Sequence, residues 1–221
     1  MMREPPYQLL RSRRKTLLLC VNREAQLVVR APMRLPETQI REFIRQKSDW
    51  INKKQQQIRE RIQQHRVLTL TDGETVPFLG QNYVVRRENT AEPMFSNGCL
   101  WLPQTMTAAD FAVWLKQEAR QFIGLRTAYY AAIMNLRFTS LKISSARRRW
   151  GSCNGQNGLN FSFRLVMCPP FAVDYVVVHE LAHIVHKNHS PAFWAYVASV
   201  MPNYRDAKIW LRDNHCIMDM I

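Results

Sequence analysis

The sequence lacks several features that would assign it to a familiar class of protein. Its five cysteines are odd in number and widely spaced, without a C-x-x-C pair, which argues against a disulfide framework and against a zinc ribbon. No segment approaches the roughly 18 consecutive apolar residues of a membrane span. The apolar run Leu17–Val21 is too short for the core of a signal peptide and is more typical of a strand. We therefore expect a cytoplasmic protein with reduced thiols and no membrane segment.

Internal repeats and low-complexity tracts are also absent. With 221 residues, 47% of them hydrophobic, the chain is long and apolar enough for one large domain or two small ones. Acidic residues are scarce, since 31 Lys and Arg face 17 Asp and Glu. The excess lies mainly in residues 1–66, which hold 16 basic and 6 acidic residues. Such a surface favours phosphate polyanions or acidic proteins, and weak nucleic-acid binding through this region is one prediction.

The first half of the chain alternates between β-rich and helical patterns. Lys15–Val21 and Gln26–Arg30 predict a hairpin. The apolar spacing from Thr38 to Gln64 predicts one helix with a dense basic and glutamine-rich face. Turn residues at Gly80–Asn82 predict a second hairpin, and a short strand is expected at Leu100–Leu102. This half is therefore predicted to be β-rich with one long basic helix.

The second half has more helix and contains the most informative motif. Its predicted elements are two helices, about Thr107–Leu136 and about Phe171–His186, and two strands, Ser140–Ala146 and Leu159–Val166. The predicted fold class is α+β. We expect an N-terminal β-hairpin and helix region over residues 1–105 and a second region over residues 106–221, unless both form one compact unit.

Four of the six histidines lie within residues 179–189. They begin with His179-Glu180-Leu181-Ala182-His183, a match to the motif H-E-x-x-H. Residues four apart project from one face of a helix, about 6 Å apart along its axis, so His179 and His183 can bind one metal ion. Zinc lowers the pKa of a water molecule toward about 7, and Glu180 is placed to accept the proton and pass it to the leaving amine. The residues before the motif are largely apolar, and burying these polar groups without a metal would be costly.

A catalytic zinc ion normally requires a third protein ligand. No Glu follows Glu180 in the sequence, which excludes a glutamate from a later helix. His189 follows the motif at the metzincin spacing, H-E-x-x-H-x5-H, and Ser190-Pro191 predicts that a new helix begins directly after it. His186 is a competitor, but it lies about 10.5 Å along the helix from the first histidine, and Asp206 has no diagnostic spacing. We therefore predict His189 as the third ligand of one zinc ion per chain.

Several sequence blocks around these residues are distinctive. They are Trp150–Cys153, the strand with Leu159, Asn160 and Arg164, Tyr175–His183, Asn188–Ser190 with Phe193-Trp194, and Asp49–Ile51 in the basic N-terminal helix. At these blocks the chain resembles the YgjP-like metallopeptidase family, a prokaryotic group with zincin-like domains. The resemblance implies a zincin-like catalytic region, one zinc ion held by His179, His183 and His189, and Glu180 as the base. The chain departs from the metzincin pattern at His186, where that pattern has Gly.

These observations predict a zinc-dependent metallohydrolase, a peptidase that acts on a peptide or protein substrate. The alternative is a basic, nucleic-acid-associated protein whose zinc site is structural or non-proteolytic. Glu180 discriminates between them, because a structural zinc site has no use for a carboxylate beside its ligands.

Four further roles stay open at this point. Cys153 can act as an extra zinc ligand, or Trp150–Cys153 can be a structural turn beneath the site. Leu159–Val166 can border the cleft and pair with an extended peptide by strand addition. Tyr175 or Arg164 can polarise a carbonyl oxygen.

Overall fold

The structure, a computed structural model, describes residues 6–22, 24–64 and 67–221. The chain forms two compact units, Met1–Arg66 and Val67–Ile221, and each has its own apolar core. The division falls at residues 66 and 67 and not near residue 105, because the sheet over residues 75–103 shares its core with the helices that follow it. Among the described residues, no helix is both long enough and apolar enough to cross a membrane.

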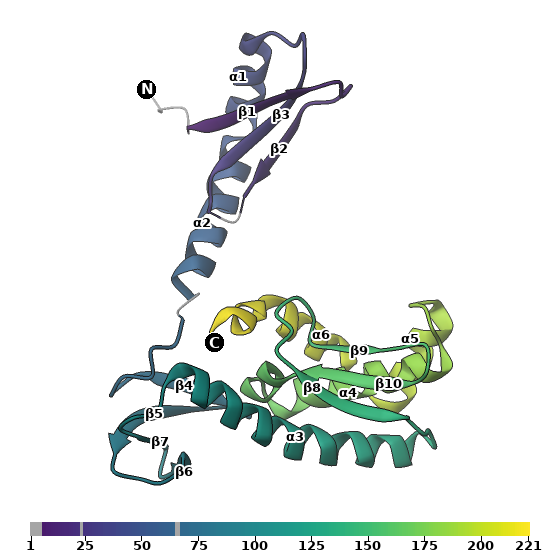
Figure 1. The fold of residues 1–221 in the computed structure, drawn as a ribbon. Coiled ribbons are helices and arrows are strands. Elements are labelled where there is room, and N and C mark those ends of the chain that lie inside the picture. Colours follow the sequence, from purple (N-terminus) through teal and green to yellow (C-terminus); the bar gives the residue numbers. More distant parts are fainter. Residues whose placement is uncertain (1–5, 23, 65–66) are drawn as a thin grey trace. The chain divides into compact units, whose positions relative to one another are not determined.

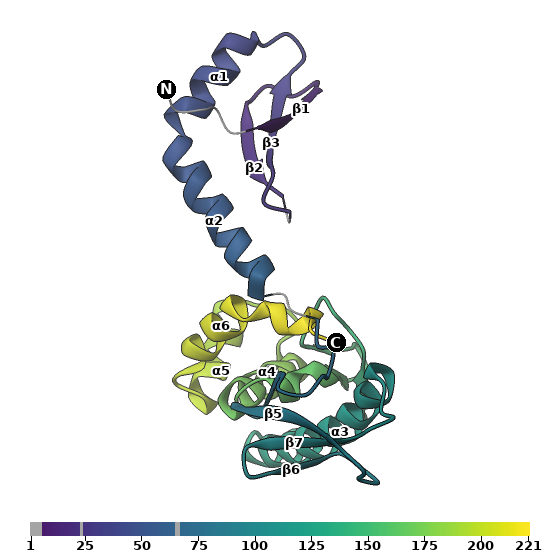
Figure 2. The same ribbon diagram turned by 90° about the vertical axis from the view of Figure 1, so that its left-hand side faces the viewer.

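The N-terminal unit is a three-stranded sheet with two helices on one face (Figure 1, Figure 2). Its elements are β1 (Tyr7–Ser12), β2 (Leu18–Val21), β3 (Leu27–Pro32), α1 (Glu37–Gln46) and α2 (Ser48–Gln64). The strands lie in the order β1-β3-β2, and β3 pairs parallel with β1 and antiparallel with β2. The core between sheet and helices consists of Leu27, Val29, Ala31, Ile40, Ile44 and Ile51. This core is small, so the unit has little apolar surface to hold it together.

The predicted hairpin is confirmed as β2 and β3. The predicted single helix over Thr38–Gln64 is wrong in one respect, because Lys47 interrupts it with φ −105° and ψ 13°. Ser48 and Asp49 follow the interruption, and such residues are typical of a helix start. Strand β1 was not predicted, because its pairing with β3 skips the intervening strand β2.

The second unit begins with a four-stranded sheet in the order β4-β5-β7-β6. Its strands are β4 (Thr75–Phe78), β5 (Gln81–Glu88), β6 (Met94–Ser96) and β7 (Cys99–Pro103). The hairpin predicted around Gly80 is confirmed as β4 and β5, and its turn lies at Leu79-Gly80 with φ 46° and 83°. Asn97-Gly98 joins β6 to β7 with φ 50° and 73°, the left-handed backbone of tight hairpins.

A second sheet of this unit has the order β8-β10-β9. Its strands are β8 (Ser140–Ser144), β9 (Gly151–Cys153) and β10 (Gly158–Ser162), and a 3-10 segment η1 (Phe163–Met167) follows. Strand β10 pairs with β8 on one edge and with β9 on the other. The predicted strand over Leu159–Val166 is shorter than expected, because the 3-10 segment begins at Phe163. The prediction that a peptide adds to this strand is wrong, because both of its edges are paired with other strands.

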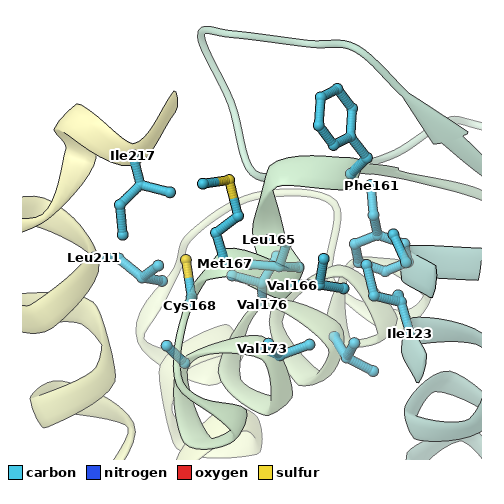
Figure 3. Packing of buried hydrophobic residues seen from close by; sticks show 14 of the residues in the cluster. Ile123, Phe161, Leu165, Val166, Met167, Cys168, Val173, Val176, Leu211 and Ile217 are labelled. Atoms are coloured by element: carbon cyan, nitrogen blue, oxygen red, sulfur yellow. The ribbon is translucent and has the colours of Figure 1, made fainter. Parts of the chain in front are cut away.

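The helices of this unit surround α4, which carries the H-E-x-x-H motif. They are α3 (Ala108–Ile133), α4 (Pro170–Val185), α5 (Pro191–Val200), α6 (Tyr204–Asp213) and a terminal 3-10 segment, η2 (His215–Asp219). Helix α4 packs against α3, α5, α6 and β9. Figure 3 shows Val173 and Val176 of α4 in the same apolar cluster as Leu211 and Ile217. This enclosure explains why the helix is apolar on most sides. Of its polar residues, Asp174 makes an ion pair with Arg126 of α3, whereas His179, Glu180 and His183 lie at the site.

Candidate metal centre

Three histidines meet where α4 ends and α5 begins. Their imidazole nitrogens include a set that lies within 4.8 Å of one another, one from each of His179, His183 and His189. The Nε2 atoms of His179 and His189 are 3.0 Å apart. The predicted helix break makes this possible, because α4 ends at Val185 and Ser190 caps α5 by accepting a hydrogen bond from the Phe193 N–H. His189 lies in the turn and folds back toward the helix that carries the other two.

Hydrogen bonds and packing orient the three rings. The Nδ1 atom of His183 lies 2.9 Å from the carbonyl oxygen of His186, and the Nδ1 atom of His179 lies 3.5 Å from the Tyr175 hydroxyl. A bond at Nδ1 leaves Nε2 free to face a metal ion, which is the usual support of a metal-binding histidine. Phe193 is fully buried beneath the cluster, with its ring centroid 4.6 to 5.0 Å from all three imidazoles.

The donor set fits a zinc ion. At the usual Zn–N distance, tetrahedral geometry places two ligand nitrogens about 3.3 Å apart, and the observed set needs only small side-chain shifts to meet it. Burial, followed by the charges of the neighbouring histidines and Lys208, lowers the pKa of His179 to about 3. Burial also lowers the pKa of His189. Both imidazoles are therefore neutral at neutral pH, as a metal ligand must be.

Glu180 lies beside the cluster and is 6% exposed. Burial raises the pKa of its carboxyl from 4.5 to about 7, while Arg149 and the backbone N–H of Cys153 oppose the rise. A carboxyl group that titrates near neutral pH suits a general base. Cys153 lies on β9, and its backbone N–H donates a hydrogen bond to the Glu180 carboxylate. This strand therefore helps to place the carboxylate.

Gly151 on β9 makes room for the Glu180 side chain. A Cβ atom at residue 151 would lie 2.7 Å from Cγ and 2.9 Å from Oε1 of Glu180, closer than real contacts allow. Only glycine therefore permits the present position of the carboxylate. The segment Trp150–Cys153, for which a structural turn beneath the site was one of two alternatives, contains strand β9 and contacts the proposed base directly.

The competing ligands lie outside the group of donors. His186 contributes its backbone carbonyl, and its ring packs against Tyr196. Asp206 is exposed on α6. The thiol of Cys153 contacts the carbonyl oxygen of Asn154, and burial raises its pKa, which disfavours the thiolate that binds zinc. The five cysteines form no disulfide in the structure.

Of the two residues considered for polarising a carbonyl oxygen, only Tyr175 is near the cluster. Arg164 is 2% exposed and donates hydrogen bonds to the carbonyl oxygens of Ser145 and Ile221. Its guanidinium therefore stabilises the fold. Tyr175 lines the same hollow as His179 and Glu180.

A helix that carries H-E-x-x-H, with a third histidine just beyond its end, is the arrangement of a metallopeptidase domain. The comparison of sequences agrees with the geometry. The chain belongs to the YgjP-like metallopeptidase-domain family, whose sequence model matches residues 15–214. The match includes most of the N-terminal unit as well as the histidine cluster. Searches of curated proteins and of solved structures found no match to the chain.

Sequence reasoning missed the parts of the site that come from distant segments. The close approach of Gly151 to Glu180 joins β9 to α4, and the hollow beside Glu180 also receives Lys208 and Arg212 from α6. A glycine in a short strand does indicate a close backbone or side-chain approach, but the sequence does not say which residue approaches it.

Proposed function

We propose that this chain is a zinc-dependent peptidase in which His179, His183 and His189 hold one zinc ion and Glu180 is the general base. The convergence of the three imidazoles beside a buried carboxylate carries this proposal. The substrate is a peptide or protein, as membership of a metallopeptidase-domain family suggests. The proposal gives Glu180 a function, which a purely structural metal site would not.

Each residue has a defined task in the proposed reaction. Zinc, when bound, supplies Lewis acidity that polarises the peptide carbonyl group and acidifies a water molecule. An Oε atom of Glu180 accepts a proton from that water and later delivers it to the nitrogen of the leaving amine. Gly151 and the Cys153 N–H keep the carboxylate in position, and Tyr175 and the His186 carbonyl orient two of the ligand rings. Burial of the carboxylate keeps its basicity close to what neutral pH requires.

The variant Glu180→Gln tests the proposal. It removes the proton acceptor and leaves all three imidazoles, so zinc content should stay near that of the wild type. Hydrolysis of a peptide mixture should fall about 10²- to 10⁴-fold, the usual contribution of general-base catalysis. Mass spectrometry of the peptides and elemental analysis of the same samples measure both quantities.

Glu118→Gln is a matched control, since Glu118 is a partly buried glutamate on α3, outside the cluster. It should keep full activity. Hydrolysis that is unchanged in a zinc-loaded Glu180→Gln sample would contradict the assignment of the base.

A further inference from the structure

A hollow of about 340 Å³ opens beside the proposed base, within the volume range of small-ligand sites. Four segments form it, and His179 and Glu180 are part of its wall. The lining residues are Arg149, Trp150, Gly151, Tyr175, Val176, His179, Glu180, Lys208, Leu211, Arg212 and His215. Because two of these belong to the proposed catalytic centre, a group in this hollow would be next to the bond that is cut.

The charges around this hollow are unequal. Three cations line it, Arg149, Lys208 and Arg212, whereas Glu180 is its only carboxylate. Arg212 makes an ion pair with Asp213, with Nε 2.9 Å from Oδ1. Within the part of the chain that the structure describes, Arg149 and Lys208 make no ion pair. Two cations beside the proposed base are therefore available to an anionic group of a ligand.

The two available cations come from different segments of the chain. Arg149 precedes β9, and its charge acts on Glu180. Lys208 is on α6, with its Nζ 4.2 Å from the centroid of the Trp194 ring, and its charge acts on His179 and His189. Lys208 and Arg212 are four residues apart and so lie on one face of α6. A ligand in the hollow is thus close to positive charge from both β9 and α6.

Apart from His215, the remaining wall is largely apolar. Trp150, Tyr175, Val176 and Leu211 provide it. Such a surface can cover the methylene groups of a side chain while a cation binds its carboxylate. All three cations are exposed to solvent, and what points to a ligand is that they line one hollow together with apolar side chains.

We infer that this hollow binds a carboxylate of the substrate beside the scissile bond, so that the enzyme prefers acidic peptides. The inference rests on the proposed peptidase function and adds its substrate class. The carboxylate can come from an Asp or Glu side chain or from the C-terminus of the peptide. Arg149 and Lys208 act as specificity-determining residues that bind this group.

A set of designed peptides tests the inference. In the first series, a decapeptide of Ala and Ser carries a single Glu, placed at each position in turn. Two further series carry Gln or Lys at the same positions. Each peptide is made with a free and with an amidated C-terminus, which separates a side-chain carboxylate from a terminal one. The zinc-loaded wild type should cleave its best Glu peptide, or the free-acid form, about tenfold faster than the neutral counterpart, as one charge-assisted hydrogen bond would give.

Lys208→Glu should abolish this preference and favour the Lys peptides, a gain that an unfolded chain cannot show. Arg120→Glu makes the same change of charge at an exposed position of α3 that does not line the hollow, so it should keep the wild-type preference. Equal cleavage of Glu and Gln peptides, with no effect of the C-terminal amide, would overturn the inference and leave the peptidase function intact.

Binding provides a separate readout. Fluorescence anisotropy with the zinc-loaded Glu180→Gln chain compares labelled Glu, Gln and Lys peptides without turnover. Tighter binding of the Glu peptide or of the free-acid form, lost in the additional variant Lys208→Glu, supports the inference. If no peptide is cleaved by the wild type, the proposed function fails. In that case the anisotropy assay still tests whether the hollow binds a carboxylate, and equal affinities for charged and neutral peptides overturn the inference.

Discussion

The two units of this chain differ in charge and in the size of their cores. Residues 1–66 carry 16 basic and 6 acidic residues, whereas residues 67–221 carry 15 and 11. The core of the N-terminal unit consists of six residues from one sheet and two helices. The second unit has a core that spans two sheets and all its helices. It alone, within the described residues, has a group of three side chains with the geometry to hold a metal ion.

The difference shows what a proposed catalytic centre requires of its surroundings. A carboxylate at 6% exposure is costly, and a large core must offset that cost to keep it in place. The N-terminal unit buries a polar group on a smaller scale, since Gln55 donates a hydrogen bond to the Ala25 carbonyl oxygen at 2.9 Å. Its charge remains on the surface, where it suits a polyanionic partner. The units should therefore respond differently to the same kinds of change.

Truncation of a core residue should show the difference between the two units most clearly. Phe193→Ala removes the ring beneath all three histidines and should lower the free energy of unfolding of the second unit by about 3–5 kcal/mol, with loss of zinc affinity. Ile44→Ala should destabilise the N-terminal unit by about 2–5 kcal/mol and leave zinc content unchanged. Hydrogen exchange by unit, together with elemental analysis, measures both effects. Zinc loss in Ile44→Ala would contradict the independence of the two cores.

Gly151→Ala should lower the catalytic activity without removing the zinc ion. Its Cβ would lie 2.7 Å from Cγ of Glu180, so the carboxylate must move while the three imidazoles stay. Peptide hydrolysis should fall about 100-fold, as expected when a catalytic group is misplaced by about 1 Å. Gly155→Ala is the matched control, because nothing lies within 4 Å of its added Cβ. Equal activities of the two variants would refute the role of β9 in placing the base.

The pH dependence of stability should change in Glu180→Gln. The folded pKa of Glu180, about 7, is above the value of 4.5 for the free group. The folded state therefore keeps a proton that the unfolded state loses, and the free energy of unfolding falls as pH rises from 4.5 to 7. The metal-free Gln variant lacks this loss, so its advantage over the wild type should grow by about 3 kcal/mol across that window and then level off.

Urea unfolding of both metal-free chains at pH 5 and pH 8 measures this advantage. A constant difference between the chains would show that Glu180 is not perturbed. His179 acts with the opposite sign in both chains, because its lowered pKa removes stability as pH falls below 6.5. The comparison of the two chains cancels that contribution.

The smallest expected effect concerns nucleic acid. The double variant Lys47→Glu/Lys53→Glu changes two exposed residues of the N-terminal unit. It should weaken binding of duplex DNA and lower the slope of log K against log salt by about 2, with peptide hydrolysis unchanged. Arg120→Glu/Arg137→Glu changes the same charge in the second unit and should leave DNA binding intact. Tight DNA binding without any peptide hydrolysis would favour the nucleic-acid alternative.

The sequence predicted the meeting of the three histidines better than the surroundings of the cluster. The interval from His183 to His189, with Ser190-Pro191 after it, predicts a third histidine in a turn, because helix geometry and capping are local. Most hairpins and helices followed from local patterns for the same reason. Strand β1 and the interruption at Lys47 did not, since pairing and packing partners decide them.

The neighbours of the site were beyond local patterns. Gly151 meets Glu180, and Lys208 reaches the cluster, only because β9, α4 and α6 pack together. No periodicity in the sequence encodes such a meeting. The strand over Leu159–Val166 shows the same limit, because its alternation predicted a strand correctly but could not reveal that both of its edges are paired.

The metal content of the purified chain tests the central claim most directly. Elemental analysis should find about one zinc ion per chain in the wild type and a sharp loss in His189→Ala. The matched variant His186→Ala should keep its zinc, because that residue supports His183 through its backbone carbonyl. A wild type that holds no zinc and takes up none when it is added, or an equal zinc content in all three chains, would contradict the three-histidine site.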